Sequence, residues 1–149
     1  MPANPHLIDD TKLSAAVTPT AGAAGAANIN GTILDMAGWD GVLVIVHFGT
    51  ITAGAATSIK MQQDTVVGFG GAADLAGTGQ TILDTDDDKV FYIDLRRPLE
   101  QFVRLVVLRA TQNSVVTAVY LQYRSRNKPS VQLAAVAGEK WLSPAEGAA

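Results

Sequence analysis

The chain has 149 residues, no cysteine and a formal net charge of −3 at pH 7. This length suits a single domain, and the missing cysteine excludes disulfides, thiolate metal sites and a cysteine nucleophile. Charged residues make up only 17% of the chain, against about 25% in typical soluble domains. Such a low share of charged residues indicates that part of the protein surface is apolar and is covered by a partner. No apolar run approaches the roughly 18 residues of a membrane span, so no membrane association is predicted.

Residues 1–27 are predicted to form an extended N-terminal arm. They contain Pro2, Pro5 and Pro19, followed by the run "AGAAGAA", and such stretches are typical of linkers. They bury too little apolar area to offset an ordering entropy of roughly 1–2 kcal/mol per residue. We therefore expect the arm to order only against a neighbour. Deletion of residues 1–20 should then leave the domain folded and weaken binding to the partner.

Residues 28–128 are predicted to form an all-β domain, an antiparallel β-sandwich or jelly roll. Short β-branched runs separated by glycine and aspartate turns predict strands near 29–36, 42–48, 57–63, 80–84, 89–95, 101–109 and 115–124. The glycine- and alanine-rich segment 68–79 is the longest loop, in which 72–77 could form one helical turn.

Three of these predicted strands are apolar on both faces. In 42–48, the set Val42, Val44, Val46 and Phe48 alternates with Leu43, Ile45 and His47, and the runs 101–109 and 115–123 behave alike. An ordinary sandwich strand buries one face and exposes the other to water. The second face needs a cover, either a long loop or another subunit, and a homo-oligomer is the simplest source.

Residues 129–149 are predicted to form a C-terminal tail. Trp141 and Leu142 would anchor it on an adjacent subunit or on a larger shell, with Pro144 ending the contact. Trp141→Ala should then weaken assembly more than it changes the fold.

One acidic stretch, "DTDDDK" at 84–89, imitates part of a calcium loop. Such a loop requires glycine at its sixth place and glutamate at its twelfth, where this chain has Lys89 and Leu95. The simpler interpretation is an acidic turn between two strands. A weak surface cation site at Asp84, Asp86 and Asp88 stays open.

Groups that could catalyse a reaction are scarce. His6 lies in the predicted arm, and His47 lies inside an apolar strand, where histidine is more often a buried or interface residue. The loop "GFGGAADLAGTG" has Ala73 where a dinucleotide fingerprint needs its third glycine. The sequence therefore predicts no enzyme and no cofactor or metal. EDTA should leave the melting temperature unchanged.

All six arginines of the chain fall within one short region. They are Arg96, Arg97, Arg104, Arg109, Arg124 and Arg126, whereas the residues up to 95 hold eleven aspartates against three lysines. Nucleic-acid binding usually needs a basic domain, and this chain is acidic, so none is predicted. Arginine is well suited to partly buried, bidentate ion pairs. Arg96, Arg97, Arg104 and Arg109 are therefore predicted to contact a subunit or partner; pairing within one subunit, of Asp94 with Arg104 or Arg109, is the alternative.

At these arginines the sequence resembles a known group of proteins. The segment "DLRRPLEQFVRLVVLRATQNSVV", preceded by "GWDGVLVIVHFGTIT" and closed by "SPAEGAA", is similar to the head decoration (cement) proteins of tailed bacteriophages. The similarity spans about residues 32–149 and has no counterpart for the arm, and Leu95 stands where the group has an aromatic residue. The resemblance implies a structural virion protein on the capsid surface. Its implied partners are the major capsid protein and its own copies, with which it would form a trimer.

The alternative function is a carbohydrate- or receptor-binding β-sandwich of a virion fibre or cell surface. Such sites expose aromatic side chains, and Trp39 in "GWDG" and Phe69 in "GFGG" are the loop aromatics that would fit. Binding on a glycan array would favour this function, whereas co-purification with capsids would favour decoration.

Overall fold

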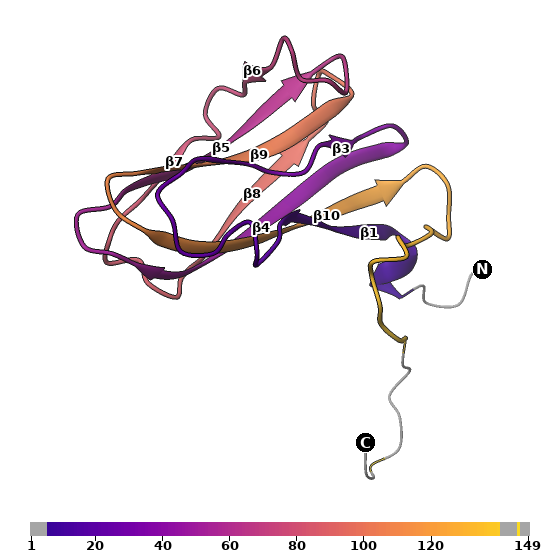
Figure 1. Cartoon of the computed structure of the whole chain (residues 1–149). Coiled ribbons are helices and arrows are strands. Elements are labelled where there is room, and N and C mark those ends of the chain that lie inside the picture. The colour runs from indigo at the N-terminus through magenta and orange to yellow at the C-terminus, as the bar shows by residue number, and fades with distance from the viewer. Residues whose placement is uncertain (1–5, 141–145, 147–149) are drawn as a thin grey trace.

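Two antiparallel sheets pack against each other in the computed structural model, which describes residues 6–140 and Glu146 (Figure 1). Sheet A has the order β1 (Thr11–Val17), β10 (Ser114–Ser125), β4 (Trp39–Ile51) and β8 (Val90–Arg96). Sheet B has the order β2 (Ile29–Asn30), β9 (Phe102–Ala110), β5 (Ala56–Asp64) and β6 (Ala73–Asp74), with β3 (Leu34–Asp35) also on β9 and β7 (Gln80–Ile82) also on β5. A short 3-10 helix, η1 (Leu7–Asp9), precedes β1.

Most connections pass from one sheet to the other. The chain crosses between β1 and β2, β3 and β4, β4 and β5, β7 and β8, β8 and β9, and β9 and β10. This confirms the predicted all-β antiparallel sandwich, and the jelly-roll connectivity stays a prediction. Across the part of the chain that the structure describes, no helix has the length and apolar character to cross a membrane.

The core lies between the sheets and follows the alternation of the strands. Side chains at every second position of β4, together with their counterparts on β9, are completely buried. The Tyr120 hydroxyl links the two sheets, because it accepts the Leu105 N–H (2.8 Å) and donates to the Thr32 carbonyl (2.9 Å). Burial raises the pKa of Tyr120, so this hydroxyl keeps its proton.

The predicted strands correspond closely to those observed. The run expected at 42–48 is the centre of β4, the run at 101–109 is β9, and the run at 115–124 is β10. The run at 29–36 is split into β2 and β3. The option of a helical turn at 72–77 is wrong for Ala73–Asp74, which pair with β5 as β6.

The prediction that residues 1–27 form an unpacked arm is wrong for residues 11–27. Thr11–Val17 form β1, which pairs with β10 from Thr11 opposite Tyr123 to Val17 opposite Ala118. Ala16 and Val17 are each 2% exposed and belong to the core. The small side chains of "TKLSAAV" give little strand signal in the sequence, and the segment is stabilised by the long partner strand instead. The folded domain therefore includes Thr11.

The "AGAAGAA" stretch is a packed crossover between the sheets. Val116 N–H donates to the Gly22 carbonyl (2.9 Å), and Gly25 and Ser114 exchange backbone hydrogen bonds. A β-carbon at Gly22 would overlap the carbonyl oxygen of Val116. Glycine is needed there because the two backbones approach too closely for a side chain.

Candidate interaction surface

The outer face of sheet A has an apolar centre on β10, β4 and β8, which no described part of the chain covers. The apolar side chains that point outward are Val115, Val119 and Leu121 of β10, Leu43 and Ile45 of β4, Val90 and Tyr92 of β8, and Leu13 of β1, which lines a hollow with Val136. The polar residues Thr117, Tyr123, His47, Asp94 and Arg96 lie on the same face around this apolar centre. Tyr92 is 67% exposed, Val90 60% and Val119 40%. The register places Ile45 between Val119 and Tyr92, so these side chains form one continuous patch. A contiguous apolar patch of this kind typically marks an interaction site.

Sheet B does have a cover on its outer face. The loop after β5 places Phe69 under the Arg104 guanidinium, which lies 4.5 Å from the ring centroid, and Phe69 is only 8% exposed. The Asp64 carboxylate holds the loop by accepting the N–H groups of Val66 (3.0 Å) and Gly71 (2.9 Å). The strands with two apolar faces were predicted to need a covering segment on their outer face. On sheet B this segment is the loop that carries Phe69, whereas the apolar centre of the outer face of sheet A has no such loop among the described residues.

The two loop aromatics of the carbohydrate-binding alternative do not form an exposed platform. Phe69 is buried beneath Arg104, and Trp39 is partly buried and packs against the core. This arrangement disfavours stacking of a sugar ring on either side chain.

Three arginines converge on one carboxylate at one end of sheet A. Asp40 lies 3.1 Å from Arg97 Nε, 3.2 Å from Arg96 Nε and 3.7 Å from Arg124 Nη1. The hydrogen bond from Arg97, with that from Arg96, holds the pKa of Asp40 below its usual range. The three arginine side chains are between 53% and 74% exposed. With Arg126 they form the basic end of the sheet, where guanidinium groups outnumber carboxylates and remain accessible to a partner.

Arg109 and Arg104 are engaged inside the subunit. Arg109 is 6% exposed, and its guanidinium donates to the carbonyls of Ala27 (2.7 Å), Ala23 (2.9 Å) and Ser114 (2.9 Å). It therefore fixes the crossover rather than presenting charge to a partner, and burial lowers the pKa of its guanidinium. Arg104 donates to Gln62 Oε1.

Asp94, the expected intrasubunit partner of Arg104 or Arg109, lies on the other sheet from both. It accepts a 2.6 Å hydrogen bond from the Tyr123 hydroxyl, whose ring lies directly over Gly41. Burial and the Asp94 carboxylate raise the pKa of Tyr123 to about 12. Asp94 and Tyr123 line, with Leu43, Leu121, Arg96 and Arg124, a hollow of about 350 Å³ on the outer face.

The stretch "DTDDDK" forms a turn at the opposite end of sheet A. Asp84 accepts the Gly54 N–H, and Asp87 accepts the Ile51 N–H at 2.7 Å. Asp86 is bound by Lys89 Nζ (2.6 Å) and the Leu83 N–H (2.8 Å). Asp88 is exposed. Among the described residues, no three histidine or carboxylate groups gather as metal ligands would. We call Asp84–Lys89 the acidic end of sheet A.

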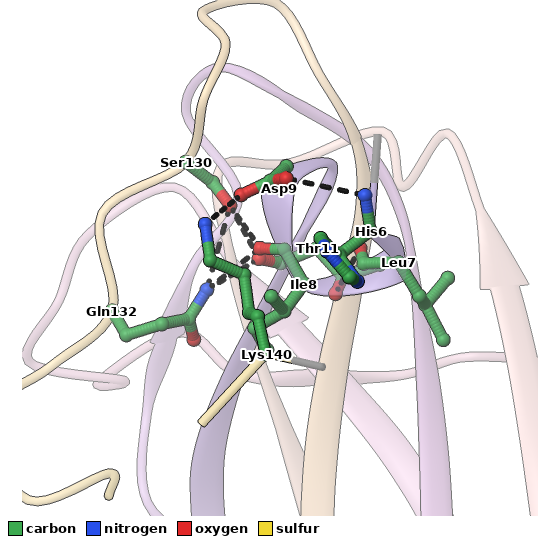
Figure 2. Close-up of polar contacts among 8 residues, drawn as sticks. All are labelled: His6, Leu7, Ile8, Asp9, Thr11, Ser130, Gln132 and Lys140. Atoms are coloured by element: carbon green, nitrogen blue, oxygen red, sulfur yellow. Dashed lines mark hydrogen bonds and ion pairs between the residues drawn. The ribbon is translucent and has the colours of Figure 1, made fainter. Parts of the chain in front are cut away.

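Ser130, Gln132 and Lys140 of the C-terminal segment lie beside η1 and the start of β1 (Figure 2). The Gln132 side-chain amide donates to the Thr11 carbonyl (2.6 Å) and accepts the Leu13 N–H (3.0 Å), so it substitutes for one peptide of a neighbouring strand. Ser130 Oγ donates to the Ile8 carbonyl, and Lys140 Nζ lies 2.9 Å from Asp9. The start of the β1 edge, which could otherwise pair with other chains, is therefore occupied. The predicted anchors Trp141 and Leu142 lie outside the described residues.

Acid should destabilise the protein through its paired aspartates. Lys89 lowers the pKa of Asp86, and the Val66 N–H lowers that of Asp64, as Arg97 does for Asp40. A carboxyl group whose pKa is lower in the folded state stabilises the fold fully at pH values above its pKa in the unfolded state, about 3.9. This stabilisation is lost as the pH falls through its pKa in the folded state. We expect the urea midpoint to change little between about pH 7 and pH 5 and to fall below about pH 4.

The Asp40→Asn variant isolates one part of this effect. It should be less stable than the parent at pH 7 and approach the parent as Asp40 becomes protonated. Urea titrations at pH 7 and pH 3 measure the difference. An identical offset at both pH values would contradict the assignment to Asp40.

No protein-family description, curated protein or solved structure matches the chain. The two-faced pattern of 42–48, 101–109 and 115–123 predicted that these strands need a second cover, and the structure shows, over the residues that it describes, that sheet A is the one left open. The roles of Arg109 and Gln132 were not predicted, since both depend on carbonyls far away along the chain.

Proposed function

We propose that this protein is a structural component of a bacteriophage head, a decoration or cement protein that binds its own copies and the major capsid protein. The observation that carries the proposal is the uncovered apolar face of sheet A. A protein that stabilises a shell needs such contact surfaces and needs no reacting groups.

The charged and polar groups of the surface support a binding role. His47 points outward between Thr117 and Val90 in the register of sheet A, with no carboxylate beside it in either neighbouring strand. A general base normally needs an orienting partner within hydrogen-bond reach. The exposed guanidinium groups of Arg96 and Arg97 can instead meet carboxylates of a partner bidentately.

The capsid contact belongs, in this proposal, to the C-terminal tail. Lys128 and Lys140 tie the tail to Asp10 and Asp9, so the chain that follows Lys140 starts from a fixed point beside η1. Trp141 and Leu142 come next in the sequence and are the proposed anchors.

Binding to phage heads tests the proposal. Heads from a phage that lacks this gene should bind the purified protein to saturation, with a fixed number of copies per capsid protein. The bound protein should raise the temperature at which the heads release DNA. Wild-type heads, whose sites are filled, are the matched control and should bind none. Failure to co-sediment with the gene-deleted heads would contradict the proposed function.

A further inference from the structure

We propose that the outer face of sheet A packs against the same face of a second copy of this chain, with the strands of the two copies running in opposite directions. This is a two-fold, isologous contact, in which one patch meets itself. It rests on the self-association included in the proposed function, adds the surface, the partner and the orientation, and puts a two-fold dimer in place of the trimer that the resemblance implies.

The first support is the apolar centre of the face. Leu43, Ile45, Val119 and Leu121 lie side by side on β4 and β10, and Tyr92 extends the patch onto β8. On sheet B the loop that carries Phe69 covers the outer face at Arg104, whereas no described segment covers this part of sheet A. A second copy supplies a surface of equal shape and chemistry.

The second support is the opposite charge of the two ends of this face. Arg96, Arg97, Arg124 and Arg126 surround Asp40 where β4 begins. The turn Asp84–Lys89, with four aspartates and one lysine, lies where β4 ends, because Asp87 accepts the Ile51 N–H. β4 has 13 residues, so at about 3.3 Å per residue the two charged ends are roughly 40 Å apart.

This separation decides the orientation. If the strands of both copies ran the same way, arginines would face arginines and aspartates would face aspartates. A two-fold axis in the plane of the interface and perpendicular to the strands places β8 of one copy over β8 of the other. Arg96, which ends β8, then lies over the Val90 end of the second β8, next to its Asp88. Both ends of the face then gain opposite-charge contacts. The antiparallel arrangement of the two copies is therefore favoured over the one in which their strands run the same way.

The area of the patch is close to the lower limit for a specific contact. Four strands about 4.8 Å apart and seven residues of about 3.3 Å give a patch of roughly 19 by 23 Å, or about 900 Å² for the two copies together before the charged rims are added. Specific interfaces begin at about this size.

A charge exchange between copies tests the inference. Arg96→Glu and Asp88→Lys each create two like-charge contacts in the two-fold dimer, so each variant alone should dissociate about tenfold more readily than the parent, or more. In a mixture of the two variants, the glutamate introduced at position 96 of one chain would meet the lysine introduced at position 88 of the other, and the native Arg96 would meet the native Asp88. Sedimentation velocity of the equimolar mixture should therefore recover the dimerisation of the parent.

The apolar centre has its own variant and control. Val119→Glu, in the middle of the face, should abolish dimerisation, and Leu99→Glu should not, since Leu99 is 92% exposed on the corner before β9. A trimeric mass for the parent, a monomer up to about 100 µM, or a mixture that fails to recover dimerisation would overturn the inference. Head binding is measured separately. Dimers that do not bind heads would refute the proposed function. A protein that binds heads but whose mixed charge variants do not recover dimerisation would refute only the two-fold contact.

Discussion

Deletion of residues 1–20 should remove most of the stability of the sandwich. The deletion removes β1, and with it the ladder from Thr11 to Val17 along β10 and the buried side chains of Ala16 and Val17. Burial of a valine side chain alone contributes about 1.5–3 kcal/mol. Loss of the whole strand should lower the free energy of unfolding by about 5 kcal/mol or more, out of a total of about 5–15 kcal/mol.

Circular dichroism and urea titration of the truncated chain measure this loss. A synthetic peptide of residues 6–20 is the matched control, because it restores the missing strand without a covalent bond and should recover folding. A truncated chain that unfolds cooperatively with the parental midpoint would show that β1 is dispensable.

Replacement of Arg109 by methionine should destabilise the protein by about 1–3 kcal/mol, because it removes three charge-assisted hydrogen bonds to backbone carbonyls, of which the one to Ser114 is buried. The guanidinium of Arg109 satisfies Ala23, Ala27 and Ser114. Methionine fills a similar volume and donates no hydrogen bond, so the crossover should be held only by the backbone hydrogen bonds of Gly22 and Gly25 to β10.

Arg126→Met is the matched control, because the Arg126 side chain is exposed and, among the described residues, only its backbone N–H has a hydrogen-bond partner, the Gly38 carbonyl. It should change the free energy of unfolding by no more than about 0.5 kcal/mol. Urea titrations at low protein concentration compare the two variants. Equal stabilities would mean that Arg109 does not hold the crossover.

Much of the fold could be predicted because the strand signals are local. The β-branched runs at 42–48, 101–109 and 115–124 alternate with turn formers, and all three are strands. The two-faced pattern also predicted that a second cover was needed. The sequence alone could not say which sheet would be covered, because that depends on the loop that carries Phe69.

The parts that were missed depend on distant contacts. β1 has weak strand signal and is stabilised by β10, more than one hundred residues later in the chain. The arginines look equivalent in sequence, yet Arg109 points into the crossover and Arg96 and Arg97 lie exposed on Asp40. Local alternation cannot separate them, because the difference lies in which backbone carbonyls the fold brings near each guanidinium.

Electron cryomicroscopy of the native phage head tests the central claim most directly. The account predicts density for the sandwich at regular positions on the outside of the capsid, with the outer face of sheet A covered by a second copy. Heads without this density, or heads on which that face is open to solvent in every copy, would contradict the account.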